Sequence, residues 1–305
     1  MSSAPQALTA SPVAAAKPRR PFWPHQHLHG SELVWAVAFV LPYAAVFLAF
    51  ALYPIAYGFW MGREPSLYSE LIADPHYAEA ALNTALFAGF GANAMMVLAL
   101  LLSGFFMRPR RWINALLVVC MLPWALPAIP AFVSFHWMLI GEYGFLDTLL
   151  RELVGIGGPV WFNHRPTALA ADIVAYIWKW LPFWILIFLA GRMAIPPDLY
   201  EAADIDGATG FRRFVHITVP LLANLYLICT ALCAIWIIGD FTAVALVSGG
   251  APALSTLVLA TLSIHYAYDI TRPALGVAAA LSALPVLVPL VILLIRRIDI
   301  RDIQL

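Results

Sequence analysis

Charged and aromatic residues that could bind a small polar molecule fall on two helical faces inside apolar stretches of the chain. The first face combines a carboxylate, a phenol, an ammonium and a phenyl ring at Asp172, Tyr176, Lys179 and Phe183. The second face repeats the spacing i, i+4, i+7 and i+11, which places residues on one side of a helix, at Cys229, Cys233, Trp236 and Asp240. Charged groups hydrogen-bond hydroxyl groups, and aromatic rings cover C–H surfaces. These faces therefore suit a small polyhydroxylated solute.

The same charges also permit a purely structural interpretation. A charge at the centre of a membrane helix costs about 2.5–3.5 kcal/mol on insertion scales, so it usually faces a cavity or a partner. Lys179 would then form an ion pair with Asp240 or Asp172 and touch no solute. Trp178 and Trp180 flank Lys179 on other faces, and we expect them to pack or to face lipid. The sequence leaves solute contact and ion pairing open.

The elements that carry these faces must cross a membrane. Of 305 residues, 63% are hydrophobic and 11% charged, whereas soluble domains have about 45–50% and about 25%. The excess must face lipid, which excludes a soluble globule. A spanning helix needs about 20 mostly apolar residues. Six runs without strand-like alternation meet that length, which predicts an all-α membrane protein with spans at about 33–61, 80–107, 112–140, 168–193, 221–247 and 274–295. Closely spaced prolines make the third span a candidate for two pieces: Pro123, Pro127 and Pro130.

Basic residues are unevenly distributed between the two sides of these spans. Twelve Lys and Arg residues fall on the side of the termini and four on the other, so the positive-inside rule predicts that both termini are cytosolic. Residues 1–31 and 301–305 are then cytosolic tails around a permease domain at 32–300. Basic and acidic residues number 17 each, which leaves no basic field for binding nucleic acid.

Reactive residue types form no catalytic or metal-binding pattern. The cysteines lie inside apolar runs and are predicted to be buried hydrophobes: Cys120, Cys229 and Cys233. Histidines alternate in the N-terminal tail, but we predict no metal site there: His25, His27 and His29. A phosphate-binding loop needs Gly-Lys-Ser/Thr, and neither Lys17 nor Lys179 stands in one. The sequence therefore predicts no enzyme active site, no metal and no cofactor in this chain.

The longest cytosolic loop, residues 195–220, has the pattern of two helices joined by a glycine turn. Pro196 and Pro197 suit the first turn of a helix, and Gly207 permits the backbone to reverse. Pro220 marks the start of the fifth span. Such a loop offers a rigid knob for another protein, or it serves as an amphipathic connector at the membrane surface.

Six residues of this loop have the spacing of a known signature. They are Glu201, Ala202, Ala203, Gly207, Ile217 and Pro220. This pattern resembles the EAA signature of membrane subunits of binding-protein-dependent ABC importers, except that Val219 replaces the usual Leu. Shorter pieces resemble the sugar-permease branch, which includes maltose and glycerol-3-phosphate permeases: Asn83–Thr84, Tyr143–Gly144, Trp178–Phe183 and Ser248–Pro252.

The resemblance implies the fold of a type I ABC importer permease in a bacterial inner membrane. Its EAA coupling helix docks on a cytosolic ATPase, which uses ATP and Mg²⁺. The coupling residues would be Glu201, Ala202, Ala203, Asp204, Gly207, Phe211, Ile217 and Pro220. The implied partners are a second homologous permease, two ABC ATPase subunits and an extracytoplasmic solute-binding protein that docks on outer loops 141–167 and 248–273. A carbohydrate or polyol is the implied cargo.

A different class of transporter is the alternative. An ion-coupled secondary transporter would use Lys179, Asp172 and Asp240 to couple solute movement to an ion gradient. Such transporters are commonly built from inverted repeats. The sequence shows no convincing internal repeat and does contain the EAA pattern, which favours the importer subunit.

Overall fold

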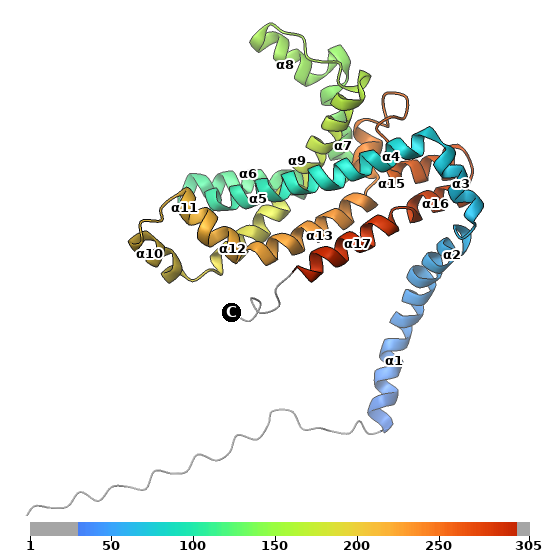
Figure 1. Ribbon diagram of the computed structural model, residues 1–305, viewed down its shortest axis with the longest axis horizontal. Helices are drawn as coiled ribbons and strands as arrows, with labels where there is room; N and C mark the ends of the chain where they lie inside the picture. Colours follow the sequence, from blue (N-terminus) through green and yellow to red (C-terminus); the bar gives the residue numbers. More distant parts are fainter. Residues whose placement is uncertain (1–29, 298–305) are drawn as a thin grey trace, which may run out of the picture. The chain divides into compact units, whose positions relative to one another are not determined.

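The computed structural model describes residues 30–297, and this part of the chain is helical with no strand (Figure 1). By length and composition, four helices could cross a membrane: Val34–Met61, Pro75–Phe106, Arg165–Met193 and Pro273–Arg296. The number is six if each of two strongly bent helix pairs is one span. The predicted all-α membrane architecture is confirmed. The histidine tract at 25–29, most of the predicted tail 1–31 and residues 301–305 lie outside the described residues.

Residues 30–56 belong to a compact unit of their own. Helix α1 (Gly30–Phe47) continues through a π-helical segment (Leu48–Leu52) into α2 (Tyr53–Met61). Large apolar side chains along it are exposed, for example Phe39 at 76% and Phe50 at 79%. This surface is what a helix surrounded by lipid requires, because every backbone polar group is satisfied within the helix and the side chains need no water.

The core of the second unit, from residue 57 onward, is built on two long helices. Helix α5 (Ala92–Phe106) packs along α9 (Arg165–Met193). Alanines at fully buried positions let the helices approach closely, and large side chains fill the remaining space. The fully or almost fully buried residues include Ala92, Met95, Ala99, Ala175, Trp184 and Phe188.

Further helices pack on this pair. Helix α4 (Pro75–Leu86) leads through a π-helical segment into α5, and α6 (Arg111–Ala125) packs on α9. Helix α13 (Ala223–Gly239) lies between α5 and α17 (Leu284–Arg296), and Figure 1 shows these helices running side by side. Helix α14 (Thr242–Val247) packs between α7 (Ala128–Leu139) and α9. The short α8 (Phe145–Val154) follows α7.

Two predicted spans are broken rather than continuous. The third, expected at 112–140, consists of α6 and α7 at 98° to each other. Pro127 disfavours helical backbone at the preceding residue, and Leu126 is extended with ψ of 145°. The fifth, expected at 221–247, begins at a 67° bend between Phe211–Leu221 and Ala223–Gly239. It is interrupted again at Asp240, whose backbone is extended with ψ of 119°. The linear run of apolar residues did not reveal the second break.

A second, smaller hydrophobic core lies among short helices that are distant in the sequence. It contains α3 (Pro65–Ala73), α15 (Leu259–Ile264), a π-helical segment (His265–Asp269) and α16 (Pro273–Leu281). The Arg272 guanidinium binds the Glu70 carboxylate, and the Tyr266 hydroxyl donates to Asp74 Oδ2 at 2.7 Å. A Cβ on Gly276 would lie 2.5 Å from the Ser263 carbonyl oxygen, so only glycine permits this close crossing.

Candidate functional site

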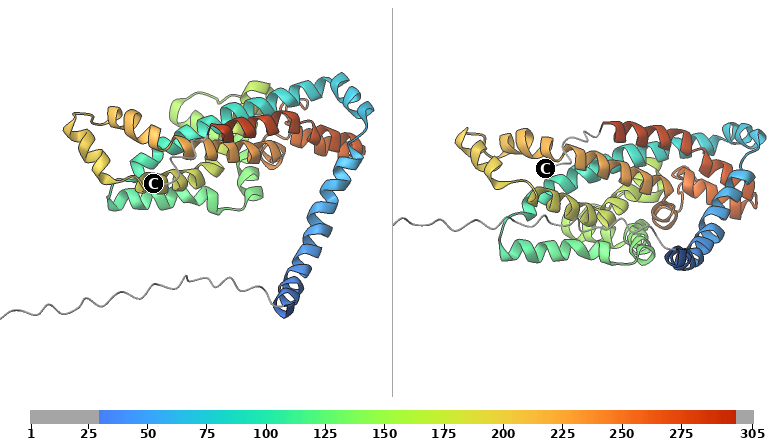
Figure 2. Two further views of the ribbon diagram at one scale, coloured as in Figure 1. Left: turned by 60° about the horizontal axis from the view of Figure 1, so that its bottom comes forward. Right: turned by 90° about the horizontal axis from the view of Figure 1, so that it is seen from below.

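The loop at 195–220, called the elbow from here on, forms the predicted helix, glycine turn and helix. Helix α10 (Pro197–Ile205) starts with proline and carries Asp198 in its first turn, where a carboxylate complements the helix dipole. Gly207 follows its end with φ of 76°, and Gly210 has φ of 56°. The chain then continues as α11 (Phe211–Arg213), a π-helical segment (Phe214–Thr218) and α12 (Val219–Leu221). Figure 2 shows the elbow at one end of the helix bundle, beyond the ends of its neighbours.

Side chains tie the two arms of the elbow together. Arg213 Nη1 donates to both Asp204 carboxylate oxygens at 3.0 Å, and its guanidinium lies 5.4 Å from the centre of the Tyr200 ring. The Tyr200 hydroxyl lies 3.2 Å from Thr218 Oγ1. Ala203 is buried inside the turn. The elbow is therefore a braced unit rather than a loose connector.

The outer side of the elbow carries exposed apolar residues. Ile205 is 88% exposed and Phe211 is 78% exposed. Glu201, Ala202 and Pro220 are also exposed, and Ile217 is half-buried. These apolar groups are therefore available for contact with another protein.

The second candidate site is an open pocket of about 530 Å³ beside the break between α13 and α14. Its lining includes four aromatic residues, a carboxylate and a threonine hydroxyl: Tyr176, Trp180, Trp236, Phe241, Asp240 and Thr242. We call it the aromatic pocket. Its volume lies within the range of about 300–1,000 Å³ typical of small-molecule sites. The predicted solute residues Tyr176, Trp236 and Asp240 thus share one pocket.

The aromatic pocket is backed by an extended group of rings. The Trp236 ring centre lies 5.4 Å from those of Phe183 and Trp184 and 6.1 Å from that of Trp180. Phe183 also stacks on Trp124 with ring centres 6.1 Å apart. Phe183 supports Trp236 and is absent from the pocket lining. These contacts hold a broad aromatic face in place without filling the pocket.

Asp240 binds the start of α14 and also lines the aromatic pocket. Its Oδ1 accepts hydrogen bonds from the backbone N–H groups of Thr242 at 2.6 Å and Ala243 at 3.2 Å, which caps the start of α14. The Thr242 side chain also hydrogen-bonds the carboxylate, and no basic side chain of residues 30–297 pairs with it. Asp240 therefore retains an acceptor for a ligand hydroxyl.

Lys179 does neither of the things expected from the sequence. Its side chain is buried, and Nζ donates to the carbonyl oxygens of Pro123 at 2.7 Å, Trp124 at 3.1 Å and Leu126 at 2.6 Å. The last carbonyls of a helix lack intrahelical partners, and Lys179 satisfies those of α6 at its break from α7. It does not line the aromatic pocket, and in the described part of the chain it pairs with neither Asp172 nor Asp240.

Asp172 and Trp180 also differ from the expectation. Asp172 is fully buried and accepts from the backbone N–H of Ser248 at 3.1 Å and the Ser248 hydroxyl at 2.8 Å, so it fastens the loop after α14 to α9. Trp180, expected to pack or to face lipid, lines the aromatic pocket one turn beyond Tyr176. Its buried indole N–H has no hydrogen-bond partner among residues 30–297. The spacing i, i+4 from Tyr176 was the signal that could have included it.

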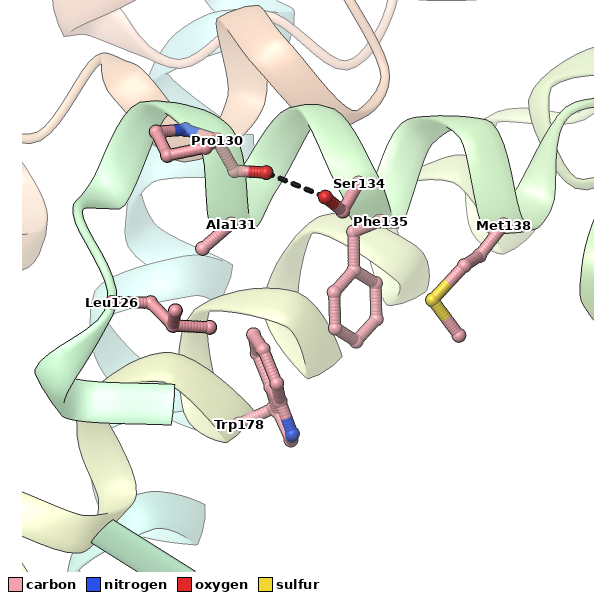
Figure 3. A pocket seen from close by; sticks show the side chains of 7 residues that line it. All are labelled: Leu126, Pro130, Ala131, Ser134, Phe135, Met138 and Trp178. Carbon is pink, nitrogen blue, oxygen red and sulfur yellow. Dashed lines mark hydrogen bonds between the residues drawn. The ribbon is translucent and has the colours of Figure 1, made fainter. Parts of the chain in front are cut away.

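A different pocket lies beside the bend between α6 and α7. It has a volume of about 250 Å³ and an apolar lining that includes Leu126, Phe135, Met138 and Trp178 (Figure 3). Its hydroxyl, on Ser134, already donates to the Pro130 carbonyl at 2.7 Å. Trp178 therefore packs as the sequence predicted, and this pocket offers a polar solute little to bind.

The described residues thus form a bundle of apolar helices with the elbow at one end and the aromatic pocket beside α13. Residues 94–301 match the family described as the inner membrane component of binding-protein-dependent transport systems. This chain belongs to that family.

Several relatives share part of the sequence. The chain is 35% identical over 193 residues to the sulfoquinovosyl glycerol transport system permease protein SmoG of Agrobacterium fabrum. The alignment covers 63% of this chain and 62% of SmoG, so this chain spans less than two thirds of the length of that relative. It is 27% identical over 255 residues to the trehalose/maltose transport system permease protein MalF of Thermococcus litoralis, and this alignment covers 79% of this chain and 86% of that relative.

A solved structure shares the fold. A chain from the crystal structure of a bacterial alginate ABC transporter, in complex with an alginate pentasaccharide-bound periplasmic protein, aligns with a TM-score of 0.77 at 20% identity. The alignment covers 87% of this chain and 93% of that chain. The predicted fold of an importer permease is thereby confirmed.

Proposed function

We propose that this chain is the permease subunit of an ATP-driven ABC importer and forms half of the pathway for a carbohydrate or polyol. The aromatic pocket is the observation that carries the cargo class. Its rings can cover the C–H face of a sugar, while the Asp240 carboxylate can bind hydroxyl groups. Relatives named as carrying sulfoquinovosyl glycerol and trehalose or maltose support the same class.

The elbow supplies the connection to an energy source in this proposal. The sequence has no Gly-Lys-Ser/Thr motif, so ATP and Mg²⁺ would be bound by a partner ATPase. The exposed apolar residues Ile205 and Phe211 would enter a cleft of that partner beside Glu201 and Ala202. Because Asp204 and Arg213 brace the elbow, a push on α10 would be passed on rather than absorbed.

The complete transporter in this proposal contains five subunits besides its cargo: this chain, a second homologous permease, two ATPases and an extracytoplasmic binding protein. Its place would be a bacterial cytoplasmic membrane with both termini in the cytosol. The basic residues favour that orientation, because they concentrate on the side of the elbow. The loops 141–167 and 248–273 would receive the binding protein on the opposite side.

The ion-coupled alternative receives no support from the geometry. Its three charged residues are bound elsewhere: Lys179 to carbonyl groups, Asp172 to Ser248, and Asp240 in part to the start of α14.

Uptake by the reconstituted importer tests the role of the pocket. We expect Trp236→Ala and Asp240→Asn each to lower sugar uptake about tenfold, the equivalent of about 1.4 kcal/mol of lost interaction. Trp178→Ala, in the apolar pocket, is the matched control and keeps uptake within about twofold at that scale. The amount of assembled complex is measured for each variant. Equal uptake by all variants at equal assembly would place the pathway elsewhere.

A further inference from the structure

Arg192 occupies an unusual position in the last turn of α9. Its side chain is buried, and its guanidinium reaches sideways to α5. Nε donates to Ser103 Oγ at 2.8 Å, and Nη2 donates to the Leu100 carbonyl at 2.8 Å. The Ser103 hydroxyl itself donates to the Leu100 carbonyl at 2.7 Å. Arg192 therefore joins the elbow-side ends of the two central helices.

The same guanidinium also contacts the elbow. Its central carbon lies 5.3 Å from the centre of the Phe214 ring, in the segment that follows α11. On the α5 side it lies against Gly104, where an added Cβ would come within 3.2 Å of that carbon. The group thus fits between Gly104 and Phe214, and a bulkier residue at position 104 would displace it. One side chain links α5, α9 and the elbow.

Stability alone does not account for a cation at this place. None of the ion pairs of the described residues includes Arg192. Burying a charge without a carboxylate is costly. The two acceptors of Arg192, the Leu100 carbonyl and the Ser103 hydroxyl, already bond each other, so an apolar residue here would leave neither unsatisfied. What arginine adds is a planar group with donors in fixed directions, which holds two acceptors and a ring in one geometry.

We infer that Arg192 is a positioning residue for coupling, which fixes α5 and α9 to the elbow so that all three move as one rigid unit. This inference rests on the proposed function of the elbow as the contact with an ATPase. Arg192 lies 12 residues after Trp180 on α9, about 18 Å along the axis at about 1.5 Å per residue. Both residues lie on α9, which contains Pro182 between them, so α9 is the element that would carry a displacement of the elbow to the aromatic pocket.

The test measures transport per ATP hydrolysed, in proteoliposomes that contain the complete importer and its binding protein. Arg192→Met keeps most of the side-chain volume and removes all donors. We expect assembly and basal ATP hydrolysis to persist, while sugar transported per ATP falls roughly tenfold, within the range of residues that modulate coupling. Arg192→Lys keeps the charge but not the planar fork, so we expect only partial recovery. Exposed Arg111→Met is the matched control and keeps the wild-type ratio.

Ser103→Ala provides a second variant that leaves the arginine in place. It removes one acceptor of the guanidinium, and we expect transport per ATP to fall about threefold, which is a smaller effect on the same scale. If Arg192→Met does not assemble, this variant decides. A wild-type ratio for assembled Arg192→Met, or for Ser103→Ala when Arg192→Met does not assemble, overturns the inference.

Gly207→Pro, which alters the elbow itself, separates the two levels of the argument. If Gly207→Pro loses coupling while the Arg192 variants keep the wild-type ratio of sugar transported per ATP, the inference about Arg192 is refuted and the contact of the elbow with the ATPase is still supported. Normal coupling in Gly207→Pro would sink the proposed contact with the ATPase as well.

Discussion

Replacement of Lys179 by methionine tests the assignment of this buried cation to the break between α6 and α7. The variant removes the donors for the carbonyls of Pro123, Trp124 and Leu126. An unsatisfied buried polar group costs about 1–3 kcal/mol. These carbonyls are only partly buried, so the lower end applies to each, and we expect Lys179→Met to lower the free energy of unfolding by about 3 kcal/mol.

The assay is thermal or denaturant unfolding of the purified permease in one fixed detergent. Exposed Arg111→Met is the control for loss of a cation and should change stability by less than about 0.5 kcal/mol. Lys179→Gln retains donors on a shorter side chain and should lie between the wild type and Lys179→Met. Unchanged stability of Lys179→Met would refute the bonding described for the bend.

A double variant separates this bonding from an ion pair. No ion pair of the described residues joins Lys179 and Asp240, so the stability losses of Lys179→Met and Asp240→Asn should add within about 0.5 kcal/mol. Recovery of stability in the double variant would instead reveal the ion pair that the sequence left open.

The remaining predictions concern the elbow and the second core. Gly207→Pro should uncouple ATP hydrolysis from transport without preventing insertion, because proline fixes φ near about −65° where φ is 76°. Substrate-stimulated ATP hydrolysis measures this effect, and a wild-type value would place the contact with the ATPase outside the elbow. Gly276→Ala should lower the free energy of unfolding by about 1–3 kcal/mol, whereas Gly89→Ala, with open space around its Cβ, should not; equal stability of the two variants would contradict the close crossing. Hydrogen bonding to Arg272 lowers the pKa of Glu70 in the folded protein. The Glu70–Arg272 pair therefore stabilises the fold fully above the unfolded pKa of about 4.3, and this stabilisation is lost as the pH falls through the lower pKa of the folded protein. The stability difference between the wild type and Glu70→Gln should shrink on acidification below about pH 4, and a constant difference would argue against the pair.

Local signals in the sequence were sufficient for the elbow. Proline at the first turn of α10 and glycine after its end act on the backbone of their own neighbours. The helix and its turn could therefore be placed before any tertiary contact was known. The long apolar runs likewise indicated the spans, because lipid imposes one length on all of them.

The partners of the buried charges could not be predicted in the same way. Lys179 binds carbonyl oxygens 53 to 56 residues away in the chain. Every residue carries a carbonyl, so no sequence pattern singles out these acceptors, whereas carboxylates attract notice as partners. The choice depends on the bend between α6 and α7, which leaves carbonyls unpaired next to α9.

The aromatic pocket shows the limit of helical periodicity. The face i, i+4, i+7, i+11 brought Tyr176 and Lys179 together, but the pocket uses Tyr176 and Trp180. A helix face is broad, and which part of it meets a cavity is set by its neighbours. Here the break at Asp240 opens that cavity, and only the packed structure reveals it.

The central claim is that a separate ATPase drives this permease through the elbow. The most direct measurement is sugar uptake into proteoliposomes that contain the permease pair and the binding protein, with and without the ATPase subunits and ATP. Uptake should occur only when both the ATPase and hydrolysable ATP are present. Concentrative uptake in vesicles that lack the ATPase, driven by an imposed ion gradient, would contradict the claim.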